Sequence, residues 1–157
     1  MIYESAHDKN TYAAAARLFA EYAASLGIDL GFQHFEKELT DLETMYAKTN
    51  GGIILCKKAD RYIGCVAVRR IDAVTAELKR MYVQPGNQGK GIGAELLDRA
   101  LQLATGLGYT AIRLDTLDTM HAAIGLYKKY GFYEIPAYYH NPISNAVYFE
   151  KKLQAGS

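Results

Sequence analysis

Residues 77–97, which read ELKRMYVQPGNQGKGIGAELL, contain the change of pattern that decides the fold. The first part mixes β-branched, aromatic and aliphatic residues with polar ones, and it stops before Pro85, which cannot donate a strand hydrogen bond. Residues 86–93 then contain four glycines. Beyond the glycines, apolar residues recur at helical spacing. They are Ile92, Leu96, Leu97, Ala100, Leu101 and Ala104. The stretch therefore predicts a strand, a glycine-rich turn and a helix.

A glycine-rich turn that opens into a helix is suited to an anion. The first amide groups of a helix have no partner within it, and the helix dipole favours negative charge there. Glycine also lets a ligand come close to the backbone. The turn over residues 86–93 therefore predicts a phosphate-binding loop.

Two common phosphate-binding motifs fit this loop poorly. A Walker loop needs Ser or Thr after its lysine, but Gly91 follows Lys90. The dinucleotide-binding pattern Gly-x-Gly-x-x-Gly/Ala is matched by Gly89, Gly91 and Ala94. That pattern normally sits directly on a strand end, whereas several residues separate it here from Val83. The chain that follows is also too short for the rest of a doubly wound sheet.

A third pattern fits better. Gln88, Gly91 and Gly93 form Gln-x-x-Gly-x-Gly after a strand, which resembles the coenzyme A loop of the GNAT acetyltransferase superfamily. In that family the next elements are a strand and a helix that carries Ala-x-x-Leu-Tyr and ends in Gly-Phe. Here residues 111–116 form the strand-like segment, and the helix motif is Ala123, Leu126, Tyr127, Gly131 and Phe132. The resemblance extends over about residues 52–150.

The resemblance implies an α/β (α+β) fold, with a mixed, mostly antiparallel twisted sheet and helices on both faces. We expect one such domain over residues 1–157. The strand before the loop and the strand over residues 111–116 should be parallel neighbours that splay apart. The other expected elements are a strand over 1–6, a helix capped by Asp8, Asn10 or Thr11 and ended by Gly27, a second helix with Phe35, Leu39 and Leu42 on one face, a hairpin of 53–58 with 62–70, a helix over 120–130, and a hairpin of 132–135 with 146–151.

The same resemblance implies acetyl-CoA as co-substrate. The loop amides would hold its pyrophosphate, and the pantetheine arm would lie along the strand end, where an amide near Tyr82 would polarise the thioester carbonyl. The residues so implied are Met81, Tyr82, Val83, Gln88, Gly89, Lys90, Gly91, Ile92 and Gly93. One position departs from the family. Met120 stands where many members carry an asparagine that contacts the cofactor.

The resemblance also implies direct acetyl transfer to a free amine, with two residues that handle protons. Tyr127 matches a tyrosine that approaches the cofactor sulfur, and a core tyrosine is the alternative. Glu77 matches an acid that serves some members as base, and a structural ion pair is the alternative. By strand alternation, Glu77 should share one face with Lys79, Met81 and Val83.

The acceptor is expected to be a primary amine of a small molecule or an amino-acid-like compound. Candidate acceptor contacts are Phe32, Arg69, Tyr139 and Asn141, with His34 and Phe35 as further wall residues. Arg69 and Tyr139 favour an acceptor that bears a carboxylate. A non-catalytic coenzyme A or acyl-CoA binding or sensing module is the other function considered, and it would not need Tyr127 as a proton donor.

Composition narrows the remaining classes. The chain has 157 residues, 50% of them hydrophobic, and a net charge of +1, so no nucleic-acid partner is expected. No apolar run approaches the roughly 20 residues of a membrane span, and the N-terminus lacks a signal pattern. We therefore expect a cytoplasmic monomer or homodimer without a membrane partner. The four histidines lack metal-site spacing, so no metal is expected.

The two cysteines, Cys56 and Cys65, lie in the two strands of the first predicted hairpin. If residues 59–62 form its turn, the cysteines are directly opposite each other. In a reducing cytoplasm they should stay as buried thiols.

Overall fold

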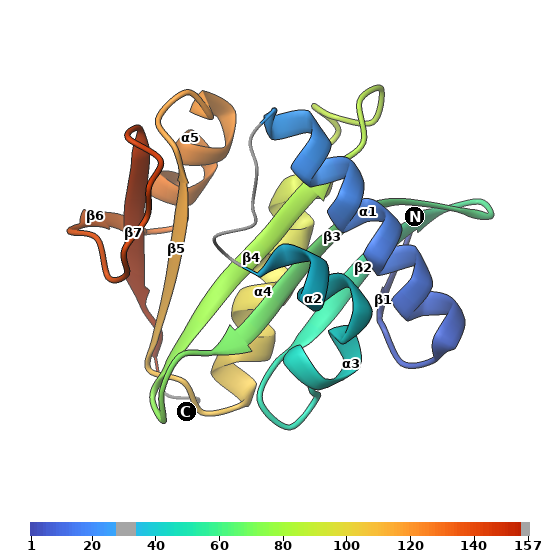
Figure 1. The fold of residues 1–157 in the computed structure, drawn as a ribbon, viewed down its shortest axis with the longest axis horizontal. Coiled ribbons are helices and arrows are strands. Elements are labelled where there is room, and N and C mark those ends of the chain that lie inside the picture. The colour runs from blue at the N-terminus through green and yellow to red at the C-terminus, as the bar shows by residue number, and fades with distance from the viewer. Residues whose placement is uncertain (28–33, 155–157) are drawn as a thin grey trace.

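The computed structural model describes residues 1–27 and 34–154. Its centre is a seven-stranded sheet in the order β1-β2-β3-β4-β5-β7-β6, with helices on both faces (Figure 1). The pairing of β4 with β5 is parallel and the other printed pairings are antiparallel, so the expected sheet is confirmed. The strands are β1 (Ile2–Ser5), β2 (Gly52–Lys58), β3 (Arg61–Arg70), β4 (Thr75–Val83), β5 (Ala111–Leu117), β6 (Tyr133–Ile135) and β7 (Ala146–Lys152). The helices are α1 (Lys9–Leu26), α2 (Phe35–Thr40), α3 (Leu42–Met45), α4 (Ile92–Gly106) and α5 (His121–Lys129).

The sheet separates two hydrophobic cores. One core lies between the sheet and α4, and it includes Leu96 of α4 and Leu78 of β4. The other lies on the opposite face, where α1, α2 and α3 cover β2 and β3. Apolar side chains alternate between the two faces along the strands, as expected for a sheet covered on both sides. Within the described ranges, no helix has the length and hydrophobicity needed to span a membrane.

The ends of α1 follow the signals in the sequence. Asp8 is the cap, because its Oδ1 accepts from the Thr11 amide at 2.8 Å while the Thr11 hydroxyl accepts from the Asp8 amide at 3.0 Å. Gly27 ends the helix with φ of 64°. The single second helix predicted from the sequence is instead two short helices, because the backbone leaves the helical range at Asp41, where φ is −139°.

The cysteine register differs from the prediction. The turn is the pair Ala59–Asp60, and a bulge at Cys56 offsets the strands, so Cys56 pairs with Gly64 and Cys65 pairs with Leu55. The two thiols are free and buried, as expected, but they lie in the cores on opposite faces of the sheet.

A second bulge interrupts β4 at Arg80, whose φ is 57°. Because the extra residue reverses the alternation, Glu77 and Lys79 face the α1 side while Met81 and Val83 pack against the α4 core. The prediction that these four side chains share one face was therefore wrong.

β4 and β5 are paired only at their beginnings. The parallel register ends at Glu77 opposite Arg113, whereas β5 continues to pair with β7 as far as Leu117. The two strands diverge beyond that point (Figure 1). The backbone of β4 from Leu78 to Val83 is thus left without a strand on that side, which confirms the predicted splay.

Candidate active site

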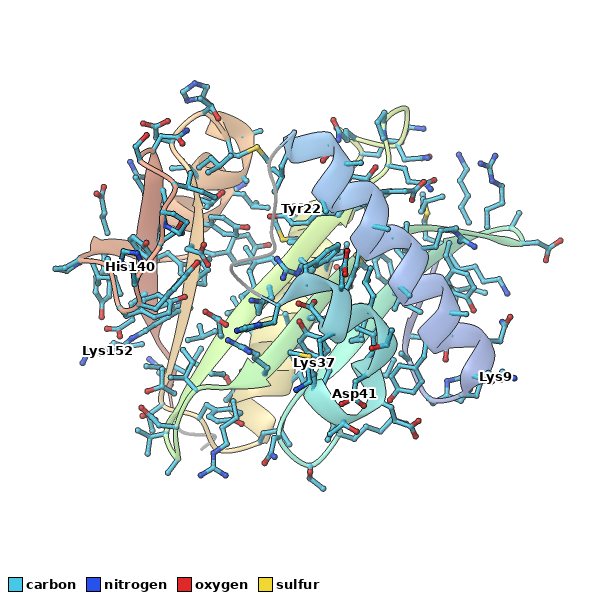
Figure 2. The ribbon with its side chains drawn as sticks, in the orientation of Figure 1. Lys9, Tyr22, Lys37, Asp41, His140 and Lys152 are labelled. Carbon is cyan, nitrogen blue, oxygen red and sulfur yellow. The ribbon has the colours of Figure 1, made fainter. Side chains whose placement is uncertain are left out.

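A small cavity of about 50 Å³ lies in the gap where β4 and β5 diverge. Five segments contribute to its wall: Tyr22 of α1, Met81 of β4, Asp115 of β5, Tyr127 of α5 and Asn141 of the β6–β7 loop. Tyr22 extends from α1 toward the end of β4, where its ring lies 6.1 Å from that of Tyr82 (Figure 2). The gap is therefore a walled space beside unpaired strand backbone.

Tyr127, the tyrosine of the helix motif, lines this cavity together with Tyr22. It is buried, and its ring packs 5.6 Å from Phe132, as the motif residues suggested. Burial raises the pKa of Tyr127 above its ordinary value, and the neighbouring Tyr22 and Asp115 add to the effect. The phenol therefore stays protonated at neutral pH and keeps a hydrogen to donate.

The glycine-rich loop presents free amides at the start of α4. Gly91 is the N-cap with φ of 81°, Gly89 has φ of 77°, and no side chain caps the helix. In the part of the chain that the structure describes, the backbone N–H groups of residues 88–93 donate to no protein acceptor. The side-chain amide of Gln88 donates to the backbone carbonyl of Val83 at 3.0 Å and so links the loop to β4. These features suit a phosphate group.

Glu77 is almost fully buried and its carboxylate is engaged on both oxygens. Oε1 accepts from Arg69 Nε at 2.8 Å and lies 3.8 Å from Lys79 Nζ. Oε2 accepts from the Tyr138 hydroxyl at 2.6 Å. The structure thus gives Glu77 the ion pairs that were the structural alternative to a role as base.

A larger cavity of about 410 Å³ lies beside the gap, on the α2 side of the sheet. Its lining residues are His34, Arg69, Arg70, Ile71, Glu77, Lys79, Tyr138 and Tyr139. Two of the predicted acceptor contacts, Arg69 and Tyr139, are thus together, and His34 joins them. Asn141 lies on the gap instead, Phe35 packs over Arg80, and Phe32 is outside the described residues.

The model of the acetyltransferase (GNAT) family matches residues 14–132, a stretch that includes the β4 edge, the glycine loop and Tyr127. The chain belongs to the GNAT family. It is 37% identical over 138 residues to an uncharacterised N-acetyltransferase of Schizosaccharomyces pombe, with 87% of this chain and 85% of the relative covered. It is 32% identical over 117 residues to an IAA acetyltransferase of Azospirillum brasilense, with 73% and 76% covered. It is therefore an acetyl-CoA-dependent N-acetyltransferase.

Solved structures give the same fold. An acetyltransferase from Streptococcus agalactiae superposes with a TM-score of 0.80 over 97% of this chain and 98% of that chain, at 23% identity. A GNAT acetyltransferase from Elizabethkingia anophelis, solved with acetyl-CoA bound, has a TM-score of 0.58 over 72% and 82% of the two chains, at 26% identity.

Sequence reasoning missed one acid of this GNAT site. Asp115 lies near the end of the predicted strand and lines the gap, where its Oδ2 accepts from the Tyr139 hydroxyl at 2.7 Å. Asn141 donates in turn to that hydroxyl at 3.1 Å. Burial raises the pKa of Asp115, although the Tyr139 hydrogen bond opposes the shift. Its place at the carboxyl end of a splayed strand was the available signal.

Sequence reasoning also missed the support of the β4 bulge. Arg80 donates through Nη2 and Nε to the two oxygens of Glu38, at 2.7 and 3.0 Å, and both side chains are buried. Tyr46 donates to the same carboxylate at 2.8 Å, and the Phe35 ring lies 5.2 Å from the guanidinium carbon. This GNAT enzyme therefore fixes the strand beside its gap from α2, through residues far apart in the sequence.

Proposed function

We propose that this enzyme transfers the acetyl group of acetyl-CoA directly to a primary amine of a small-molecule acceptor. The observation that supports it most is the gap cavity, which brings a buried, protonated Tyr127 next to the unpaired edge of β4. The larger cavity opens beside it and shares Lys79 with its wall, and we assign the acceptor to that cavity.

The co-substrate fits the chain at two places. The free amides of residues 88–93 suit its pyrophosphate, with the helix dipole of α4 adding to the attraction. The edge of β4 at residues 81–83 offers backbone groups to the pantetheine amides, as an added strand would use them. Together these contacts direct the thioester toward the gap and Tyr127.

Substitution of Gly91 tests the loop. Gly91→Val should weaken acetyl-CoA binding about tenfold or more, because a branched side chain at φ of 81° would enter the space that the phosphates need. Isothermal titration calorimetry measures the affinity. Gly108→Val is the matched control, because Gly108 has φ of 91° but lies beyond the far end of α4. Equal loss of affinity in both variants, or in neither, would contradict the assignment.

The transfer itself needs only groups that the site holds. The amine attacks the thioester carbon as the carbon–sulfur bond breaks, so no side chain of the enzyme has to be acylated. Tyr127 donates to the departing sulfur, and an acid on the α1 side of the sheet accepts the proton that the ammonium form of the acceptor must lose. Glu77 is the acid predicted from the sequence for the second task.

Glu77→Gln separates the two roles open to Glu77. With Arg69 and Tyr138 already bound to its oxygens, we expect the variant to raise KM and lower turnover through a loosened acceptor cavity, while the acid limb of the pH–rate profile persists. Steady-state kinetics between pH 5 and 9 measure both effects. Loss of the acid limb would instead establish Glu77 as the base.

A turnover screen tests the function as a whole. Release of coenzyme A thiol is followed with acetyl-CoA and a panel of amines, amino acids and polyamines, and mass spectrometry identifies the product. We expect at least one primary amine to be acetylated well above the rate of thioester hydrolysis. Tight acetyl-CoA binding without turnover across the panel would favour the binding or sensing module.

A further inference from the structure

We propose that the acceptor is a compact amine that carries a carboxylate, with Arg69 and Lys79 around the carboxylate and Asp115 at the amine. The inference rests on the proposed transfer and names its acceptor class. It assigns one end of the acceptor to the 410 Å³ cavity and the other end to the gap.

The charges of the larger cavity favour an anion. Among the described residues, the cations Arg69 and Lys79 line it with one carboxylate, that of Glu77, although the net charge of the whole chain is only +1. Arg69 uses Nε for Glu77, which leaves the other guanidinium nitrogens for a ligand. Among the described residues of this cavity, the two positive charges of Arg69 and Lys79 exceed the one negative charge of Glu77.

Lys79 is the cation with most to gain from a bound anion. Its side chain is only 8% exposed, and its ammonium lies 3.8 Å from Glu77, too far for a hydrogen bond. Burial lowers the pKa of Lys79 to about 8, with Arg80 and Arg69 adding to the fall while Glu77 opposes it. A buried ammonium without a close acceptor is costly. A carboxylate in the cavity would supply that acceptor.

Asp115 provides the complementary charge in the gap. It forms no ion pair with a described residue, and one hydrogen bond from Tyr139 holds it. The titratable groups near enough to act on its charge are Tyr22 of α1, Glu77, Lys79 and Arg80 of β4, Tyr127 of α5, Tyr138 and Tyr139 of the β6–β7 loop and Tyr148 of β7. A half-buried carboxylate in this setting suits an ammonium group and then the proton that the ammonium releases.

The larger cavity and the gap cavity are connected through residues that they share. Lys79 lines both cavities, and Tyr139 lines the larger one while bonded to Asp115 in the gap. The parallel register ends with Glu77 opposite Arg113, and Lys79 and Asp115, each two residues further along, lie on the same face as that pair, one on each side of the gap. An acceptor that places its carboxylate at Lys79 and Arg69 therefore directs its amine toward Asp115 and the thioester.

The protons balance in this arrangement. Asp115 takes one proton from the ammonium and later releases it to solvent. The free amine forms the carbon–nitrogen bond as the carbon–sulfur bond breaks. The nitrogen then loses a second proton, which restores the Tyr127 hydroxyl after that hydroxyl has given its own proton to the sulfur.

Matched acceptors test the carboxylate end. Amino acids with different spacing between amine and carboxylate are compared with their carboxamides and with polyamines. We expect kcat/KM at least about tenfold higher for the best amino acid than for its carboxamide, on the scale of a hydrogen bond to a charged group. Arg69→Gln should remove most of that difference by raising KM for the amino acid more than for its carboxamide. Lys37→Gln, on the exposed side of α2, is the control (Figure 2). Equal use of the carboxamide, or a preference for polyamines, overturns the proposal.

The pH–rate profile tests the amine end. Asp115→Asn should lower kcat about 10²-fold or more and remove the acid limb. Tyr139→Phe should move that limb to higher pH, because the Tyr139 hydrogen bond lowers the pKa of Asp115. An unchanged limb in both variants overturns the assignment of Asp115. Acetyl-CoA affinity and turnover with simple amines are measured in parallel, because their loss would instead count against the transfer function itself.

Discussion

Tyr127→Phe should lower turnover about 10²–10⁴-fold, the usual range for loss of a general acid. The variant keeps the ring and its packing against Phe132 but removes the donor that faces the gap. Because charge on sulfur develops only as the thioester breaks, the affinity for acetyl-CoA should change little. Stopped-flow or steady-state release of coenzyme A, together with calorimetric binding, measures the two quantities.

Tyr130→Phe is the matched control for this result. Tyr130 follows α5, packs against the same hydrophobic core and does not line the gap. Its loss of a hydroxyl should leave turnover near that of the unmodified enzyme. Equal turnover in Tyr127→Phe would assign Tyr127 to the core, with Tyr22 as the next donor to substitute.

Glu38→Gln should lower the free energy of unfolding by about 3–5 kcal/mol, as expected when one partner of a buried ion pair is removed. The variant leaves the Arg80 guanidinium buried without a countercharge, because both carboxylate oxygens of Glu38 receive its hydrogen bonds. Chemical denaturation at pH 7 measures the loss. Glu36→Gln, an exposed acid on the same helix, should change stability little.

The stabilisation that the Glu38–Arg80 ion pair provides should depend on pH. Burial alone would raise the pKa of Glu38, but the hydrogen bonds and charge of Arg80 outweigh it and hold that pKa below its ordinary value. The stabilisation is therefore complete above the unfolded-state pKa of about 4.3 and is lost as the pH falls further. The stability gap between the enzyme and Glu38→Gln should shrink on acidification. A gap that stays constant from pH 7 to pH 3 would contradict the ion-pair account.

The elements that sequence predicted well are those with local signals. The strand end at Pro85, the glycine turn and the apolar spacing of α4 lie within one short stretch, and each reports its own conformation. The cap at Asp8 and the stop at Gly27 are equally local. Tyr127 was found through its place in a motif, and the structure puts it in the gap.

The features that sequence missed depend on contacts between distant residues. The bulge at Arg80 is held by Glu38, 42 positions earlier, so strand alternation alone predicted the wrong face for Met81 and Val83. The offset of Cys56 from Cys65 likewise follows from a bulge that no local residue announces. Asp115 became a candidate only when the fold brought Tyr139 to it.

A crystal structure of the enzyme with coenzyme A tests the central claim most directly. The account predicts the pyrophosphate on the amides of residues 88–93, the pantetheine arm along β4 at residues 81–83, and the thiol within hydrogen-bond distance of the Tyr127 hydroxyl. Coenzyme A bound away from the gap between β4 and β5, or a thiol that points away from Tyr127, would contradict it.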